Sequence, residues 1–156
     1  MHKTLATLAL AGVSAAPLLA QAQPQPLTLD VTLKEYRGEG AYLAIYLTDA
    51  DGQYQKTLWV AGKKAKYYRH LRDWSRGGGA QRAEYDGLTG ASVGSGKNLT
   101  VEVELEPALL DAGYQIRIDS AVEDKRDNRA EVILPLTREP GAAAGSGYVD
   151  RASYRF

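Results

Sequence analysis

The sequence predicts a mainly β protein, an immunoglobulin-like antiparallel β-sandwich with one short helix and a long glycine-rich loop. Three observations favour this fold. Most apolar residues beyond the N-terminal region alternate with polar residues, which is typical of strands with one buried face. These short alternating runs are separated by turn residues, as in a sandwich. Only one stretch carries apolar residues at helical spacing.

Seven segments are predicted to be strands. Residues 27–33 alternate strictly, and residues 42–47 form a nearly continuous apolar run that indicates a central strand. The other strands are expected at residues 55–60, 99–105, 114–119, 130–135 and, as an edge strand that ends the fold, 148–156. Turn residues occupy 49–52 and 124–128. The small residues of 141–147 predict a solvated connection.

One helix is predicted over residues 66–75, because the spacing of four residues places them on one face: Tyr67, His70, Leu71 and Trp74. We expect Trp74 to pack in the core. The helix should end at Gly77–Gly79, after which the chain has little apolar periodicity. Residues 77–98 are therefore predicted to form a long glycine-rich loop. Loops of this length within a compact domain are uncommon and are often functional.

Residues 1–22 are predicted to be a cleavable signal peptide. Lys3 supplies a basic region, an apolar run covers residues 5–20, and an Ala-Gln-Ala cleavage site ends at Ala22. The run is too short for a stable membrane span, which needs about 20 apolar residues. We therefore expect residues 23–156 to form a single soluble domain in the periplasm.

The composition excludes several classes of function. Acidic and basic side chains number 19 each, so no net charge favours nucleic acid or anionic lipid as a partner. The absence of cysteine excludes disulfides, thiolate metal sites and iron–sulfur clusters. One of the two histidines, His2, lies in the predicted signal peptide, and His70 alone cannot form a histidine-rich metal site. No metal site is therefore predicted.

The predicted loop contains Asp-Gly-Leu-Thr-Gly-Ala-Ser at residues 86–92. This segment resembles the flavinylation motif, Asp-x-x-(Ser/Thr)-Gly-Ala-(Thr/Ser), of extracytoplasmic flavoproteins. In that family an exported, Mg²⁺-dependent FAD:protein FMN transferase joins FMN through a phosphoester to the last hydroxyl residue. The resemblance implies covalent FMN on Ser92, and the other motif positions are Asp86, Thr89, Gly90 and Ala91. Threonine is the commoner acceptor in the family, and this chain has serine instead.

The residue types of the motif suit this modification. The acceptor must be an alcohol, because its oxygen attacks the FMN phosphorus of FAD and displaces AMP. Small neighbours such as Gly90 and Ala91 allow the segment to enter another enzyme's active site. Asp86 or Thr89 could stabilise the turn through hydrogen bonds from side chain to backbone. The alternative is an ordinary turn rich in glycine, serine and threonine. Ser95 is a weaker acceptor candidate because Gly-Ala does not precede it.

A tethered flavin also needs an aromatic or apolar wall for its ring. Tyr85, directly before the motif, and Trp74 are candidates, and the predicted helix also offers Tyr67 and Tyr68. His70 could hydrogen-bond to a flavin, although a structural role is the simpler interpretation. A basic stripe could contact the FMN phosphate or a partner, or could be a solvated helix face; it comprises Arg69, Arg72 and Arg76.

A wider resemblance covers most of the chain after the predicted signal peptide. Residues 42–52, 57–59 and 68–74, together with the motif, resemble a family of predicted periplasmic proteins of poorly defined function. That family is linked to PepSY-domain membrane proteins and to the FMN transferase. The resemblance implies an electron-carrying role beside a membrane oxidoreductase, such as a PepSY-domain protein.

Two functions of different classes therefore remain. The first is a periplasmic flavoprotein that carries covalent FMN and acts as an electron carrier or redox subunit rather than as an independent catalyst. The alternative is a non-redox binding or structural β-sandwich module, because fold alone does not determine function. A hydrolase with Ser92 and His70 in a triad is disfavoured, since no nucleophile elbow surrounds Ser92.

Overall fold

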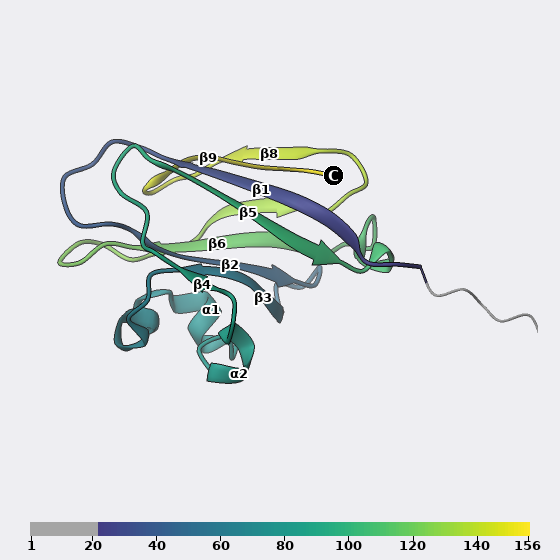
Figure 1. Ribbon diagram of the computed structural model, residues 1–156, viewed down its shortest axis with the longest axis horizontal. Helices are drawn as coiled ribbons and strands as arrows, with labels where there is room; N and C mark the ends of the chain where they lie inside the picture. The colour runs from purple at the N-terminus through teal and green to yellow at the C-terminus, as the bar shows by residue number, and fades with distance from the viewer. Residues whose placement is uncertain (1–21) are drawn as a thin grey trace, which may run out of the picture.

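The computed structural model describes residues 22–156 as two packed β-sheets with a helical layer on one face (Figure 1). The first sheet has the order β5–β1–β9–β8, with strands Asn98–Leu105, Gln25–Leu33, Val149–Arg155 and Gly141–Ala144. The second has the order β4–β3–β2–β6–β7, with strands Thr89–Gly90, Tyr54–Ala61, Tyr42–Thr48, Gln115–Ala121 and Asn128–Pro135. The predicted mainly β sandwich is confirmed. Residues 1–21 of the predicted signal peptide lie outside the described residues.

The main core lies between the two sheets. Alternate residues of β1 point into it, as the strict alternation of this segment predicts. All four of them are buried, and they are Leu27, Leu29, Val31 and Leu33. The opposite sheet contributes mainly residues of its two central strands, β2 and β6: Leu43, Ile45, Leu47, Ile116 and Ile118.

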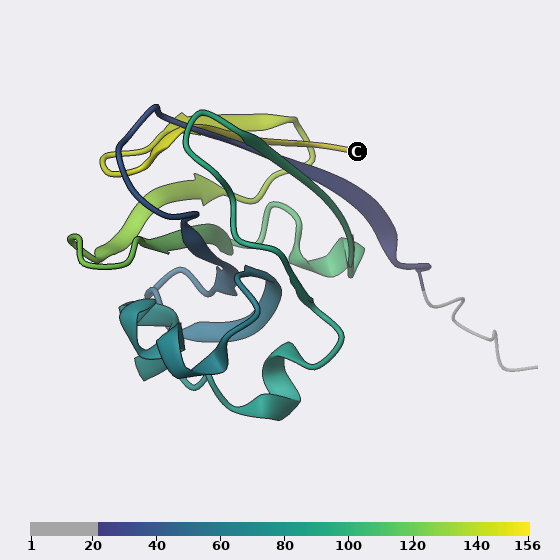
Figure 2. The ribbon, with the colours of Figure 1, turned by 60° about the vertical axis from the view of Figure 1, so that its left-hand side comes forward.

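The central position of β2 explains its continuous apolar run. Three of its residues face the main core, whereas Ala44 and Tyr46 face the other side and belong to a second buried cluster. That cluster includes Tyr68, Leu71 and Trp74 of the helical layer, which lies below the five-stranded sheet in Figure 2. Because the strand is covered on both faces, neither face needs polar residues.

The predicted helix over residues 66–75 is divided into two pieces. A 3₁₀ helix, η1, spans Ala65–His70, and α1 spans Arg72–Arg76, with non-helical dihedral angles at Leu71 between them. Residues six apart in a regular α-helix lie about 120° apart around its axis. The interruption lets Tyr68 and Trp74 enter the same cluster, where their ring centroids are 5.5 Å apart. Trp74 is fully buried, so its predicted place in the core is confirmed.

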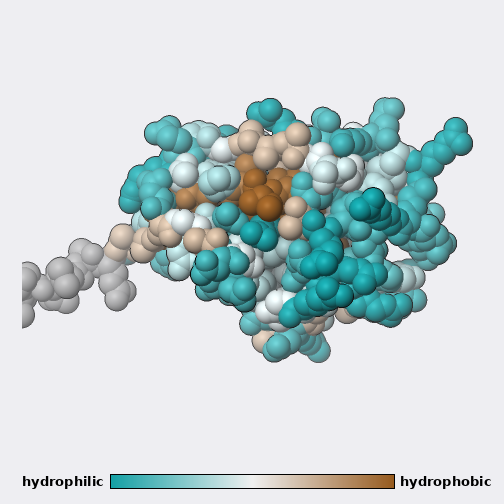
Figure 3. Space-filling view, turned by 180° about the vertical axis from the view of Figure 1, so that it is seen from behind, coloured by the Kyte–Doolittle hydropathy of each residue, from teal (hydrophilic) through white to brown (hydrophobic). Residues whose placement is uncertain are grey.

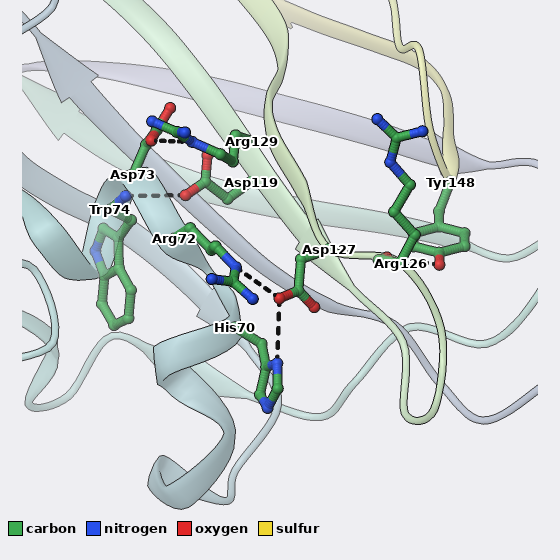
Figure 4. A network of polar contacts seen from close by, with 9 residues as sticks. All are labelled: His70, Arg72, Asp73, Trp74, Asp119, Arg126, Asp127, Arg129 and Tyr148. Atoms are coloured by element: carbon green, nitrogen blue, oxygen red, sulfur yellow. Dashed lines mark hydrogen bonds and ion pairs between the residues drawn. The ribbon is translucent and has the colours of Figure 1, made fainter.

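Asp119 on β6 connects the helical layer to the sheet (Figure 4). Its buried carboxylate accepts hydrogen bonds from the backbone N–H of Trp74 at 2.9 Å and of Ala130 at 2.7 Å. The hydroxyl of Tyr46 donates a third bond at 3.0 Å. Burial raises the pKa of Asp119 above its ordinary value, and these three hydrogen bonds oppose the shift. The carboxylate thereby satisfies three donors from three separate segments, and the hydrogen bonds from Trp74 and Tyr46 are buried.

The C-terminal region differs from the prediction in two respects. Residues 141–144 form strand β8 rather than a solvated connection, and β8 pairs with β9 at the edge of the sheet. β9 lies between β1 and β8, so the prediction of an edge strand at residues 148–156 was wrong. The side chains of β8 are small, so its alternation of half-buried and exposed residues is not visible in the sequence. At Gly141 a small residue is needed, because the backbone packs against the ring of Tyr154.

A buried carboxylate holds the turn between β8 and β9. Glu131 accepts hydrogen bonds from the backbone N–H groups of Gly147, Tyr148 and Val149 at 3.1, 3.2 and 2.8 Å. The hydroxyl of Ser120 also hydrogen-bonds to this carboxylate. The turn is therefore tied to β6 and β7 of the opposite sheet, which explains how a glycine-rich segment keeps a defined structure.

The segment 77–98 is more ordered than the predicted loop. It contains a short helix, α2, at Arg82–Tyr85, and the two-residue strand β4. Among the described residues the remaining helical segment is η2, at Pro107–Leu109. β4 pairs in parallel with the end of β3, so the motif is anchored to the sheet.

The face opposite that of Figure 1 is largely polar, with one apolar area near its centre (Figure 3). The large hydrophobic residues that are exposed in the described chain are Ile133 and Phe156. Within residues 22–156, no helix has both the length and the apolar character needed to cross a membrane.

Candidate functional site

The motif begins with a turn and then runs along the edge of the five-stranded sheet as an extended strip. Asp86 and Gly87 form a turn, where Gly87 has a φ of 77° that favours glycine. The turn is closed by backbone hydrogen bonds, from Asp86 to Arg82 and from Leu88 to Tyr85, both at 2.9 Å. The side chain of Asp86 is exposed. The turn thus depends on backbone contacts rather than on the side-chain bonds suggested by the sequence.

Backbone hydrogen bonds then hold the strip against β3. Val60 donates to the carbonyl of Leu88, and Gly62 donates to the carbonyl of Gly90, both at 2.8 Å. The next contact follows Ser92: Val93 and Ala41 exchange two hydrogen bonds, at 2.7 and 2.9 Å. The acceptor residue therefore lies in a short span that is fixed at both ends.

Gly90 has a structural requirement that the motif alone does not reveal. A side chain at this position would place its Cβ 2.7 Å from the Cζ2 atom of Trp59. The indole of Trp59 packs under the strip, and its buried Nε1 has no hydrogen-bond partner within residues 22–156. Glycine thus allows the backbone to pass directly over an aromatic ring.

Ser92 is exposed, as an acceptor for another enzyme must be. Its hydroxyl faces the β1–β2 connection, because a Cβ on Gly40 would lie 2.5 Å from the Ser92 Oγ. The weaker candidate, Ser95, is partly buried, and its hydroxyl accepts a hydrogen bond from the backbone N–H of Tyr36 at 2.7 Å. Of these two serines, Ser92 is therefore the accessible alcohol.

A cavity of about 520 Å³ adjoins Ser92, within the range typical of small-molecule sites. Its walls come from three segments: the β1–β2 connection with the start of β2, the η1 segment, and the turn between β6 and β7. Two tyrosines, Tyr42 and Tyr67, line it. Cationic and anionic side chains also line the cavity, and they are Lys64, Arg69, Lys125, Glu39, Glu123 and Asp124.

Ion pairs join two of these walls (Figure 4). Asp127, beside the β6–β7 turn, accepts a hydrogen bond from the Nε of Arg72 at 2.8 Å, and its Oδ2 lies 3.2 Å from the Nδ1 of His70. Nearby, Arg129 pairs with Asp73 of α1 at 2.7 Å. Asp127 thus gives His70 a structural role, which the sequence had suggested without a partner. His70 also lines the cavity.

The structure separates the aromatic residues that were considered as a flavin wall. Trp74 is fully buried, and its Nε1 donates to the hydroxyl of Thr57 at 2.9 Å. Tyr85 is half-buried against Tyr68, with ring centroids 5.0 Å apart. None of these three aromatic residues lines the cavity beside Ser92. Of the four aromatic candidates, Tyr67 alone lies there.

Several lining residues could not be found from the sequence. Gly40 and Tyr42 precede the motif by about fifty residues, and Lys125 follows it by more than thirty. The bridge between Ala41 and Val93 brings the first pair to Ser92. The pairing of β2 with β6 brings the β6–β7 turn to the same place. No local pattern predicts such non-local contacts.

A hydrolytic triad gains no support from these contacts. His70 and Ser92 both line the cavity, but in the described part of the chain no hydrogen bond joins them. A nucleophile and its general base are normally within hydrogen-bond reach of one another. Asp127 is shared by His70 and Arg72, which is consistent with a structural pairing.

The comparison with known families gives one match. A model for the family described as "Predicted periplasmic protein (DUF2271)" matches residues 25–151, which include the motif, the cavity and every strand except the end of β9. No curated protein matches the chain, and no solved structure matches it. The family's description agrees with the predicted export. Because the match covers most of its length, the chain belongs to the DUF2271 family of predicted periplasmic proteins.

Proposed function

We propose that this protein is a periplasmic flavoprotein that carries FMN on Ser92 through a phosphoester bond. It acts as an electron carrier or redox subunit beside a membrane oxidoreductase, such as a PepSY-domain protein. One observation carries the proposal: the last residue of the motif is an exposed alcohol at the border of a cavity with aromatic and charged walls. The flavin supplies one- or two-electron redox chemistry, for which this chain has no cysteine or metal-binding motif of its own.

The described residues fit such a group. Tyr42 and Tyr67 offer apolar surface, whereas cations such as Lys125 can pair with phosphate, and the cavity's carboxylates can accept hydrogen bonds from ribityl hydroxyls. The exported FMN transferase would supply FAD and Mg²⁺. The Ser92 Oγ forms a bond to the FMN phosphorus, the pyrophosphate bond breaks, and AMP leaves with the bonding electrons. The serine proton passes to a base of the transferase or to water.

Mass spectrometry of the full-length chain, exported together with the transferase, tests the attachment. We expect a mass increase of one FMN less one water, on a peptide that contains residues 86–92. The yellow colour should remain with the denatured chain, because only a covalent flavin survives unfolding. A form without residues 1–22 should stay unmodified when the transferase is exported. A colourless chain of unchanged mass would favour the alternative, a non-redox binding module.

The substitution Gly40→Ala tests whether the geometry around the acceptor matters for modification. The added methyl group would lie 2.5 Å from the Ser92 Oγ, so the serine must move or rotate. We expect the modified fraction to fall several-fold, although the motif itself is unchanged. Gly94→Ala is the matched control, because a Cβ there meets only the Lys97 side chain, at an ordinary 3.4 Å. Equal modification of the two variants would show that the contact has no role.

A further inference from the structure

We infer that the cavity beside Ser92 holds the isoalloxazine ring of the attached FMN, with Tyr42 and Tyr67 as its aromatic wall. This inference rests on the proposed function and concerns where the ring lies after attachment. A tethered ring could instead extend into solvent, where it would meet a partner directly. The structure favours docking for three reasons, which concern the chemistry of the cavity, the rigidity of its wall and the effect of the tether.

The cavity matches a ligand with mixed chemistry. Isoalloxazine has an apolar dimethylbenzene end and a polar pyrimidine end with both N–H and carbonyl groups. The lining combines tyrosine rings with ammonium, guanidinium and carboxylate groups, all around one space of about 520 Å³. Ligand pockets commonly have this arrangement, in which apolar walls supply contact area and a few polar groups set the orientation.

The aromatic wall is held in place before any ligand binds. The ring of Tyr42 packs directly on Gly62, whose φ of 111° favours glycine. Its hydroxyl accepts a hydrogen bond from the backbone N–H of Lys64 at 3.2 Å, and its ring contacts that of Tyr67 edge-on at 5.6 Å. A wall that is already ordered loses little conformational entropy when a ring contacts it.

The tether makes docking an intramolecular event. Ser92 itself lines the cavity, so the attached group begins at the border of the space it would occupy. A short flexible linkage gives an effective concentration on the order of millimolar. A modest intrinsic affinity then keeps the ring in the cavity for most of the time, provided that its Kd lies well below this effective concentration.

The attached flavin reports its own position, because contact with a tyrosine ring quenches flavin fluorescence by electron transfer. We expect the intact flavoprotein to be several-fold less fluorescent than the flavopeptide released from it by protease. Visible circular dichroism should be strong in the intact protein and weak in the digest. Tyr67→Leu should recover much of the fluorescence and weaken the dichroism, while the mass still shows attached FMN.

Tyr67 is the better position for this test, because Tyr42 also packs on Gly62 and accepts the hydrogen bond of the Lys64 backbone, so its removal would change the cavity wall itself. Tyr114→Leu is the matched control: Tyr114 is half-buried at the opposite end of β6 from the cavity, so its loss should leave the quenching unchanged. Equal fluorescence of intact protein and digest, or equal effects of the two variants, would overturn the inference. A chain without attached flavin would instead contradict the proposed function, which the mass measurement detects separately.

Discussion

Replacing Ser92 with alanine is expected to abolish covalent flavin in protein that is exported together with the transferase. The reason is chemical: attachment requires an oxygen nucleophile, and alanine has none. The backbone bonds that flank Ser92, from Gly62 to Gly90 and between Val93 and Ala41, do not involve its side chain. The fold should therefore persist, and the mass of the variant should equal that of the chain alone.

Two further variants separate loss of the acceptor from other effects. Ser92→Thr restores an alcohol of the type that is commoner in flavinylation motifs, so the FMN mass should return. Ser95→Ala removes the only other hydroxyl side chain between Ser92 and Asn98, and it should leave the modification in place. If Ser92→Ala still carried covalent FMN, the assignment of the acceptor would be wrong.

Replacing Asp119 with alanine is expected to cause the largest loss of stability, about 3 kcal/mol. The substitution removes the acceptor for the backbone N–H groups of Trp74 and Ala130 and for the hydroxyl of Tyr46. A buried donor without a partner costs about 1–3 kcal/mol, and water that enters the vacated space would offset part of the total. Urea unfolding of the variant and the wild type measures the difference.

The neighbouring Asp73 is a matched control for this experiment. Its ion pair with Arg129 is largely accessible to water, with 56% of the arginine side chain exposed, and such pairs contribute about 0–1 kcal/mol. Asp73→Ala should therefore reduce stability much less than Asp119→Ala. Similar losses in the two variants would mean that the buried carboxylate has no special role in holding α1 on the sheet.

The pH dependence of stability provides an independent measurement on Asp119. Burial raises the pKa of this carboxyl above the ordinary value of 3.8, so the folded chain binds the proton more tightly than the unfolded chain does. The resulting stabilisation is present below 3.8 and is lost as the pH rises through the raised pKa. The stability advantage of the wild type over Asp119→Ala should consequently decrease as the pH rises from 3.8 to the raised pKa, and it should stay constant above that pKa.

Local patterns predicted most of the strands and the motif. Alternation along β1 and the continuous apolar run of β2 predicted their burial, because side chains of a strand alternate between two faces. The motif was visible because its seven residues are contiguous, and an attachment site for another enzyme depends on local sequence. The burial of Trp74 also followed from its spacing.

Non-local packing decided the rest. Tyr68 and Trp74 share one buried cluster only because the helix is interrupted at Leu71, which helical periodicity cannot predict. β9 is an interior strand because β1 pairs with one of its edges and β8 with the other, and its own residues do not reveal the second partner.

Ser92 and its surroundings show the same difference between what local sequence predicts and what non-local packing decides. The sequence alone indicated Ser92 as the residue for attachment. The cavity beside it depends on the bridge between Ala41 and Val93 and on the pairing of β2 with β6, which bring Tyr42 and the β6–β7 turn to Ser92. Tyr67 reaches the cavity on η1, where its ring contacts that of Tyr42. These contacts join residues that are tens of positions apart, and their stability comes from the buried core between the strands. Only the tertiary structure could place a binding space next to the motif.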